Sequence, residues 1–164
     1  MPSECLLFRR NGEEEEMEKI KVRMKKLDQK AILPTYGSPF AAGADLYACL
    51  DGDVTIAPGK TEFIKTGIAM ELPEGLVALI YARSGLASKR GLAPANKVGV
   101  VDCDYRGELM VALHNHSDKE ETIQNGDRIA QMVITPYITA DFEEAETLSD
   151  TVRGEGGFGS TGRK

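Results

Sequence analysis

Residues that favour reverse turns recur every few positions along this chain, and they keep the apolar runs between them short. The clearest turn sequences are Asp51–Asp53, Ala57–Lys60, Pro73–Gly75 and Asn125–Asp127. Glycine, proline, asparagine and aspartate favour turns because they preset or tolerate the backbone angles that a chain reversal needs. The runs between these turns have the length of strands, and almost none shows helical periodicity. The chain is therefore expected to be all-β.

Alternation of apolar and charged residues supports this expectation. Ile20, Val22 and Met24 alternate with lysine and arginine, as in a strand with one buried face. The expected strands cover residues 19–25, 44–50, 54–56, 62–72, 76–82, 98–101, 109–113 and 128–135. A single short helix is expected at Ser84–Arg90. Short strands separated by turns are typical of a jelly-roll-like β-sandwich or barrel, which is the predicted fold.

Composition limits the size, partners and compartment of the protein. A chain of 164 residues suffices for one domain with a full core. Its net charge of −6 disfavours binding of long nucleic acid through phosphates, so no nucleic-acid partner is expected. The cysteines Cys5, Cys49 and Cys103 lack metal-ligand spacing and indicate a reducing compartment, the cytoplasm or, in a eukaryote, also the nucleus. The longest apolar run, Leu76–Ala82, is too short to cross a bilayer, and no membrane partner is expected.

The first eighteen residues differ from the rest of the chain. Glu13–Glu16 is a block of like charges with little apolar surface beside it to bury. Such a segment repels itself and cannot compensate the entropy lost on ordering. Residues 1–18 are therefore expected to be a disordered extension, and residues 19–164 to form the folded domain with its C-terminal arm.

The stretch Asn96–Leu113 contains both a turn and reactive side chains. Its apolar ends flank a short polar centre, and this layout predicts a β-hairpin. The centre contains the carboxylates Asp102 and Asp104 and the ring of Tyr105. A carboxylate that is ionised at neutral pH can orient or deprotonate a water molecule. Taken alone, the same residues also fit a solvated turn.

Three further segments place polar groups beside apolar strands. Asp45 follows a glycine at a strand start, where an aspartate commonly caps its own backbone. Arg83 and Ser84 follow an apolar strand, and a guanidinium beside free backbone N–H groups fits either an anion site or a surface turn. Gln131 interrupts an apolar run and fits an edge strand as well as a ligand contact.

The glycine-rich end, Arg153–Lys164, carries a Gly-x-Gly-x-x-Gly pattern at Gly154, Gly156 and Gly159. The dinucleotide-binding and Walker A interpretations both fail, because no helix follows these glycines and no lysine stands in the required order. A glycine-rich arm is flexible when free. On a nucleotide it could stack Phe158 on the base and present hydroxyl, N–H and guanidinium groups to phosphates. A disordered tail is the alternative.

Together these segments, in this order and spacing, resemble the five motifs of the trimeric dUTP pyrophosphatase (dUTPase) family. The five motifs are Ala42–Ala48, Arg83–Ala87, Gly99–Glu108, Gly126–Gln131 and Arg153–Gly162. One such motif alone is weak or moderate, whereas all five in series are highly specific. The resemblance covers Lys19–Lys164, with residues 152–164 as a mobile arm, and leaves residues 1–18 outside.

The resemblance implies a jelly-roll homotrimer in which each active site draws residues from all three subunits. Asp102 is the implied base for the water that attacks the α-phosphorus. Tyr105 would pack under the sugar, where a 2′-hydroxyl has no room. Asn96 and the backbone around Val100 and Met110 would pair with the edge of uracil.

The remaining implied contacts concern the phosphates and the metal. The residues expected to hold phosphate oxygens are Arg83, Ser84, Gly85 and Gln131. The residues expected to close over the nucleotide from the arm of a third subunit are Arg153, Phe158, Gly159, Ser160 and Thr161. Asp45 would lie near Mg²⁺, joined to it through a water molecule.

The implied reaction is hydrolysis of dUTP to dUMP and pyrophosphate, which keeps uracil out of DNA and supplies dUMP for thymidylate synthesis. An acidic protein needs Mg²⁺ and a few arginines to hold so many negative charges, and metal-bound pyrophosphate is a good leaving group. Two alternatives remain: a dCTP deaminase-like enzyme, and a nucleotide-gated regulatory binding protein. The paired aspartates and the glycine-rich arm favour dUTP hydrolysis over both.

Overall fold

The computed structural model describes residues 19–157. Within them the chain forms twelve strands and one helix. In chain order these are β1 (Arg23–Lys26), β2 (Thr35–Tyr36), β3 (Ala44–Tyr47), β4 (Val54–Ile56), β5 (Thr61–Lys65), β6 (Ile68–Glu71), β7 (Leu76–Tyr81), α1 (Ser84–Arg90), β8 (Leu92–Pro94), β9 (Gly99–Val101), β10 (Met110–Asn115), β11 (Glu121–Ile123) and β12 (Arg128–Pro136).

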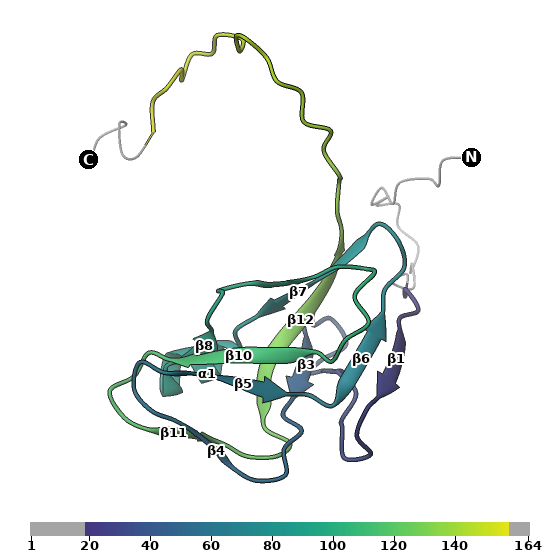
Figure 1. Ribbon diagram of the computed structural model, residues 1–164, viewed down its shortest axis with the longest axis vertical. Helices are drawn as coiled ribbons and strands as arrows, with labels where there is room; N and C mark the ends of the chain where they lie inside the picture. The colour runs from purple at the N-terminus through teal and green to yellow at the C-terminus, as the bar shows by residue number, and fades with distance from the viewer. Residues whose placement is uncertain (1–18, 158–164) are drawn as a thin grey trace.

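The strands pair antiparallel in four sheets. The largest has the order β2-β3-β12-β7-β9, and a second has the order β5-β10-β8. Two smaller pairs, β1-β6 and β11-β4, extend the structure at its sides. In Figure 1 the sheet of β5, β10 and β8 lies across the larger sheet that contains β12 and β7. The expected all-β, jelly-roll-like fold with one short helix is confirmed.

Strand β10 illustrates how the sequence pattern builds the core between the sheets. Val111, Leu113 and Asn115 are buried, whereas the residues between them face outward, because successive strand residues point to opposite faces. Asn115 is polar but fully buried, and its amide nitrogen donates to the carbonyl oxygens of Ile56 and Lys119, each at 2.8 Å. These bonds satisfy the buried amide and join β10 to the β11-β4 pair.

The strand expected over residues 62–72 is in fact two strands, β5 and β6. They are separated at Gly67, whose φ of +66° suits glycine. A Cβ at this position would lie 2.7 Å from Sγ of Cys49 and 2.9 Å from Cβ of Ala31. Strand β5 pairs with β10 and β6 with β1, so the chain passes here from one sheet to another.

The predicted β-hairpin at Asn96–Leu113 is wrong in its pairing. Strand β9 pairs with β7, and β10 pairs with β5 and β8, so the two strands belong to different sheets. The polar centre between them therefore spans the two layers of the sandwich. This arrangement leaves a gap between the layers that a hairpin would have closed with backbone hydrogen bonds.

Helix α1 has the predicted bounds. It ends at Gly91, which adopts a left-handed conformation with φ +66° and donates its N–H to the Ala87 carbonyl. Near the same end, Arg90 Nε lies 2.7 Å from Oε2 of the buried Glu121, and its Nη2 donates to the carbonyl of Thr122. The helix is thereby fixed to β11.

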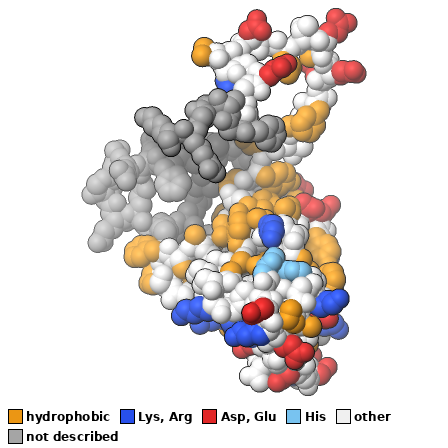
Figure 2. All heavy atoms as spheres, turned by 90° about the vertical axis from the view of Figure 1, so that its left-hand side faces the viewer, with side chains coloured by type: hydrophobic (Ala, Val, Ile, Leu, Met, Phe, Trp, Pro, Cys, Tyr) orange, Lys and Arg blue, Asp and Glu red, His pale blue; other side chains and the backbone are white. Residues whose placement is uncertain are grey.

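Residues 137–157 contain no helix or strand and extend away from the domain after β12, as Figure 1 shows. Their side chains are exposed apart from a partly covered pair of glycines at the end. Acidic side chains gather along this segment, seen at the top of Figure 2. No helix within residues 19–157 is long and apolar enough to span a membrane. The predictions for residues 1–18 and 158–164 lie outside the described residues.

Candidate active site

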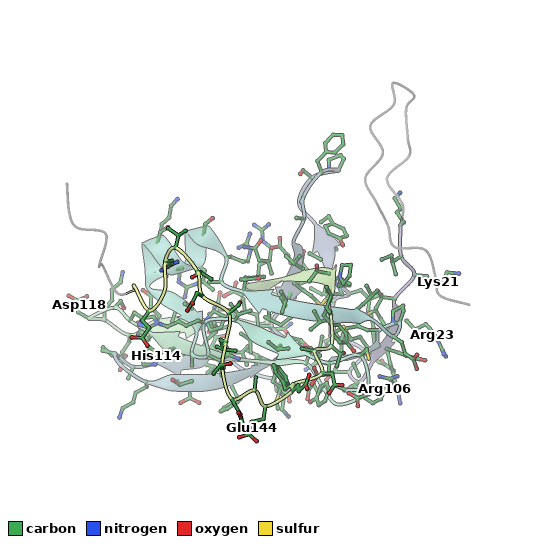
Figure 3. The ribbon with its side chains drawn as sticks, turned by 90° about the horizontal axis from the view of Figure 1, so that it is seen from above. Lys21, Arg23, Arg106, His114, Asp118 and Glu144 are labelled. Atoms are coloured by element: carbon green, nitrogen blue, oxygen red, sulfur yellow. The ribbon has the colours of Figure 1, made fainter. Side chains whose placement is uncertain are left out.

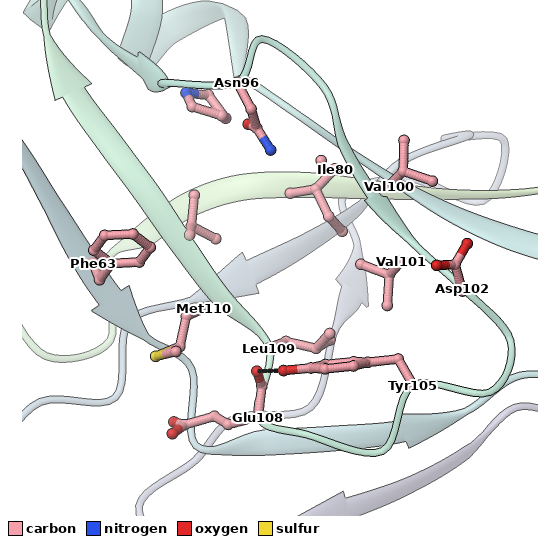
Figure 4. A pocket seen from close by; sticks show the side chains of 13 residues that line it. Phe63, Ile80, Asn96, Val100, Val101, Asp102, Tyr105, Glu108, Leu109 and Met110 are labelled. Carbon is pink, nitrogen blue, oxygen red and sulfur yellow. Dashed lines mark hydrogen bonds between the residues drawn. The ribbon is translucent and has the colours of Figure 1, made fainter.

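A cavity of about 270 Å³ lies where the polar centre crosses between the two sheets (Figure 4). Five residues predicted for the site line it, from β9, β10 and their flanking loops. They are Asn96, Val100, Asp102, Tyr105 and Met110. The cavity has the size expected for part of a small-molecule ligand.

Apolar side chains form much of the cavity wall. Ile80 of β7 and Val101 of β9 contribute from the larger sheet, and Phe63 of β5 contributes from the smaller one. Met110 and Val100 remain 49% and 63% exposed, so apolar surface surrounds the cavity mouth. Such a wall suits the faces of a flat heterocyclic ring, while polar groups at its edge fix the orientation of the ring.

The turn that follows β9 is held by its own hydrogen bonds. The Tyr105 N–H donates to the Asp102 carbonyl at 3.2 Å, and the Tyr105 hydroxyl donates to the Glu108 carbonyl at 3.1 Å. The Arg106 guanidinium donates to the Cys103 carbonyl at 2.6 Å and to the Tyr105 carbonyl at 3.0 Å. These bonds fix the Tyr105 ring along one side of the cavity (Figure 4).

Asp102 lies on the cavity rim with its carboxylate exposed. Among residues 19–157 no side chain or backbone group makes a hydrogen bond or ion pair with this carboxylate. Both oxygens are therefore available to a water molecule. An aspartate in this state can accept a proton from the water as it attacks.

Tyr137, just beyond β12, borders the same turn and was not predicted from the sequence. Its hydroxyl lies 3.9 Å from Sγ of Cys103. This contact, and secondarily the nearby carboxylates of Asp102 and Asp104, raises the pKa of the Tyr137 hydroxyl above its ordinary value. The phenol is therefore protonated at neutral pH.

A second group of predicted residues lies around β3, the end of β7 and β12. The Asp45 carboxylate is buried and accepts two hydrogen bonds, from Arg83 Nε at 2.6 Å and from Arg128 Nη1 at 3.1 Å. Gln131 donates through Nε2 to the Ala82 carbonyl at 2.8 Å. Arg128 was not among the predicted site residues.

The start of α1 completes this second group. Ser84 and Gly85 are exposed at the first turn of the helix, directly after Arg83. On the opposite side, Gly43 passes so close to Gln131 that a Cβ there would lie 2.6 Å from Oε1 of Gln131. The Gln131 amide is thereby held between Gly43 and the Ala82 carbonyl, next to Arg83 and the start of α1.

The second group does not contribute to the cavity on the same chain. None of Asp45, Arg83, Ser84, Gly85 and Gln131 lines the cavity that contains Asp102 and Tyr105. Figure 3 shows the breadth of the domain along β10, from Arg106 before the strand to His114 near its end. On one chain, the cavity that contains Asp102 and Tyr105 is therefore lined by other residues than those gathered around Asp45, which are called the arginine group below.

The predicted arm residues are described only in part. Arg153 lies in the exposed segment and donates through Nε to the Gly156 carbonyl at 2.8 Å. This contact is within the arm itself. Phe158, Gly159, Ser160 and Thr161 lie outside the described residues.

Possible metal ligands are sparse within residues 19–157. No three side chains of histidine, cysteine, aspartate or glutamate there converge to hold a metal ion. Each oxygen of Asp45 already accepts a hydrogen bond from an arginine. The water-mediated contact of Asp45 with Mg²⁺ stays a prediction, and a metal bound here would take most ligands from the phosphates and from water.

Comparison with known proteins gives a consistent result. Residues 29–162 match the sequence profile of the dUTPase family. The chain belongs to the dUTPase family. It is 52% identical over 145 residues to the deoxyuridine 5'-triphosphate nucleotidohydrolase of Desulfitobacterium hafniense, covering 88% of this chain and 96% of that protein. The corresponding protein of Syntrophotalea carbinolica is 48% identical over 146 residues, which cover 89% and 99% of the two chains.

Solved structures of the dUTPase family share the fold. The dUTPase of Staphylococcus bacteriophage 80alpha, solved with dUPNHPP, is 30% identical and has a TM-score of 0.79 over 87% of this chain and 99% of its own. A dUTPase from phage phi11 of S. aureus, described with a structural Mg(II) ion, is 25% identical and has a TM-score of 0.71 over 79% and 99%. The resemblance drawn from the five motifs is confirmed, and dUTP diphosphatase is the enzyme class named for the relatives.

Two apolar residues of the cavity wall were not predicted from the sequence. Phe63 and Ile80 line the cavity but lie outside the five motifs. Phe63 faces outward at 69% exposure, opposite Ala112 of β10. A large exposed aromatic residue beside a motif strand was the available signal, and it becomes visible only when the register of β5 on β10 is known.

Proposed function

We propose that this dUTPase-family chain hydrolyses dUTP to dUMP and pyrophosphate. The observation that carries the proposal is the Asp102 carboxylate, which has no hydrogen-bond or ion-pair partner among residues 19–157 and lies on the rim of a cavity with an apolar wall. The names of its relatives support the same substrate. In a cell this reaction would keep uracil out of DNA and supply dUMP for thymidylate synthesis.

Uracil selection would come from the edge of the cavity. Asn96 and the backbone at Val100 and Met110 would provide hydrogen-bonding groups beside an apolar wall, and bound uracil would cover them. Buried polar groups matched to uracil are left unpaired when cytosine enters, and such mismatches can reduce kcat/KM by up to ~10⁴-fold. The Tyr105 ring, fixed by its bond to Glu108, would lie against the sugar and exclude a 2′-hydroxyl.

In the chemical step, a water oxygen forms a bond to the α-phosphorus while its proton passes to the Asp102 carboxylate. The bond from the α-phosphorus to the bridging oxygen breaks, and pyrophosphate leaves with the electron pair. Arg83, Ser84, Gly85 and Gln131 would hold the phosphate oxygens, so that charge developing on the leaving group is stabilised. Water is the only nucleophile that this scheme requires.

Mg²⁺ would enter the site as part of the substrate, Mg·dUTP. The sparse metal ligands among residues 19–157 support this view. The ion would neutralise phosphate charge and make pyrophosphate a better leaving group. Arginine side chains then supply the remaining positive charge.

A complete site would require more than one subunit. The arginine group does not line the cavity of its own chain, and this supports the predicted homotrimer in which neighbouring subunits bring the two together. The extended segment 137–157 would carry the glycine-rich arm to a site formed by the other two chains. The arm residues, from Arg153 to Thr161, would then close over the nucleotide.

The test is product analysis with Mg²⁺ and each of dUTP, dCTP, UTP and dTTP, for the wild type and for Asp102→Asn. We expect dUMP and pyrophosphate from dUTP alone. The substitution should lower kcat about 10²–10⁴-fold, the usual contribution of a general base, while binding of a non-hydrolysable dUTP analogue is retained.

Other products would point to other functions. Release of ammonia from dCTP would identify a deaminase. Tight binding of dUTP without turnover by the wild type would identify a nucleotide-gated binding protein. A fully active Asp102→Asn variant would refute the role of this carboxylate as base.

A further inference from the structure

We propose that Arg128 is a positioning residue for the phosphate end of the active site. It acts through the buried carboxylate of Asp45, which in turn fixes the guanidinium of Arg83. This inference rests on the proposed function, because it assigns a role to Arg128 in binding the triphosphate of dUTP. Arg128 lies within the Gly126–Gln131 motif, but it was not among the residues expected to contact the nucleotide or the metal.

The first support is the division of contacts on Asp45. Its Oδ1 accepts from Arg83 Nε at 2.6 Å, and its Oδ2 accepts from Arg128 Nη1 at 3.1 Å. The Asp45 side chain is 12% exposed, whereas those of Arg83 and Arg128 are 26% and 51% exposed. The carboxylate is thus the covered centre of a three-residue ion cluster, with one arginine on each oxygen.

The second support is the nitrogen atom through which Arg83 contacts Asp45. Asp45 engages Nε, and no other residue among 19–157 makes a hydrogen bond with the two terminal nitrogens of Arg83. A guanidinium held through Nε keeps its outer N–H groups in a fixed plane, suited to two oxygens of a phosphate. The side chain is therefore oriented before a ligand arrives, and less rotamer entropy is lost on binding.

The third support is an irregularity in β12. Arg128 of β12 pairs with Tyr47 of β3, and Gln131 of β12 pairs with Asp45 of β3. Between these two pairs the register of β12 against β3 shifts. Residues three apart in a regular strand point to opposite faces, but the extra residue of a bulge removes this offset. Asp45 and Tyr47 share one face of β3, so their partners Arg128 and Gln131 share it as well.

The bulge also explains how a charged residue fits beside the core. Ile129 is fully buried, while Arg128 directly before it reaches the Asp45 carboxylate. Bulges are frequent beside active sites, where they redirect a side chain. Here the redirected side chain is Arg128, and it joins the face that carries Asp45 and Gln131.

The contact of Arg128 with Asp45 limits how Arg83 can bind the same carboxylate. Without Arg128, the Asp45 carboxylate would keep one free oxygen, and Arg83 could rotate around it or pair with both oxygens at once. Pairing with both would turn its terminal nitrogens inward, away from a phosphate. Arg128 thus occupies the second oxygen and leaves Arg83 a single mode of contact.

The experiment compares Arg128→Met and Arg128→Lys with the wild type in three measurements. These are the affinity for an α,β-imido analogue of dUTP with Mg²⁺, the affinity for deoxyuridine, and steady-state kinetics with dUTP. For Arg128→Met we expect analogue affinity to fall about 10–100-fold and KM to rise by a similar factor, because phosphate contacts alone are disturbed. Deoxyuridine affinity should change less than about twofold, and Arg128→Lys should recover part of the loss.

A double-mutant cycle with Asp45→Asn tests whether Arg128 acts through Asp45. If it does, Arg128→Met added to Asp45→Asn should cause little further loss of analogue affinity. Additive losses would overturn the proposal and indicate that Arg128 binds phosphate directly. Equal weakening of deoxyuridine and analogue, or a large fall in Tm for both Arg128 variants, would show a purely structural role.

Arg23→Met is the matched control, because Arg23 also pairs with a carboxylate, Glu71 at 2.9 Å, but on the exposed surface of β1 and β6. It should leave all three measurements unchanged. Failure of the proposed function would appear differently, as a wild-type protein that neither binds the analogue nor hydrolyses dUTP. A wild type that does both, with Arg128→Met indistinguishable from it, would refute this inference alone.

Discussion

The position of the Tyr105 ring depends on the residue two places after it. A Cβ on Gly107 would lie 2.5 Å from Cζ of Tyr105 and still closer to its hydroxyl. The backbone of Gly107 is not in a left-handed conformation, so alanine is tolerated by the main chain itself. The conflict is between the methyl group and the ring, and it can be relieved only by displacing the ring.

We expect Gly107→Ala to reduce the discrimination between dUTP and UTP about tenfold, because a displaced ring no longer excludes the 2′-hydroxyl. The measurement is the ratio of kcat/KM for the two nucleotides. Gly52→Ala is the matched control, since a Cβ at Gly52 meets no atom within 4 Å. An unchanged ratio in Gly107→Ala would show that Tyr105 does not select the sugar.

At the scale of single residues, the motif spacing predicted the polar residues of the site but not the side chains that contact them. Asp102 and Tyr105 line the cavity as expected, because they lie within one short turn whose sequence fixes its local structure. Arg128 received no role although it lies within the Gly126–Gln131 motif, and its spacing from Gln131 would place the two on opposite faces of a regular strand. The bulge that reverses this depends on how β12 pairs with β3, more than eighty residues away in sequence.

At the scale of elements, α1 depends on a buried ion pair at its C-terminal end. The Arg90 guanidinium holds the pKa of Glu121 below its ordinary value of 4.5, and the Glu121 side chain is 9% exposed. Because the pKa of Glu121 is lower in the folded state, this carboxylate is protonated more readily in the unfolded chain than in the folded one as the pH falls below 4.5. The stabilisation is complete above that pH and is lost as the pH falls through the folded-state pKa.

We therefore expect Glu121→Gln to lower the free energy of unfolding by about 1–3 kcal/mol at neutral pH, and by much less in acid. The measurement is urea unfolding across that pH range at one protein concentration. Glu71→Gln, in the exposed pair with Arg23, should cost less than about 1 kcal/mol at any pH. A Glu121→Gln deficit that stays constant with pH would show that packing, not charge, accounts for the loss.

The helix and strands also show which element bounds can be predicted from sequence patterns alone. The bounds of β4 and α1 agree with prediction, because their turn and capping residues are local. Strands β2, β8 and β11 were missed, since two or three residues are too few to show an alternating pattern. Strand β8 even ends at Pro94, which an edge position tolerates because proline lacks an N–H donor.

At the scale of the whole molecule, the separation of the two residue groups makes a shared site testable. Asp102→Asn and Arg83→Met should each be inactive alone. If a site takes Asp102 from one subunit and Arg83 from another, randomly mixed trimers should recover about one quarter of wild-type activity, because each intact residue is present with a probability of about one half. Co-refolding equal amounts of the two variants and assaying dUTP turnover measures this recovery.

Each variant refolded alone provides the control, and light scattering establishes that the mixed species is a trimer. Mixed trimers without activity would mean that Asp102 and Arg83 serve the same site from one chain. A monomer that still turns over dUTP would exclude sharing altogether. Trimer assembly was predicted only from the family resemblance, because no local pattern in the sequence specifies the contact surface.

The extended segment after β12 also determines how far the C-terminal arm can reach. Fully extended, residues 137–157 span about 70 Å, roughly twice the diameter of a domain of this size. A glycine-rich end tethered at that range would sample neighbouring cavities at an effective concentration on the order of millimolar. Contacts too weak to act between free molecules would then suffice to cover a bound nucleotide. The same weakness would let the arm leave quickly, so that release of product need not wait for it.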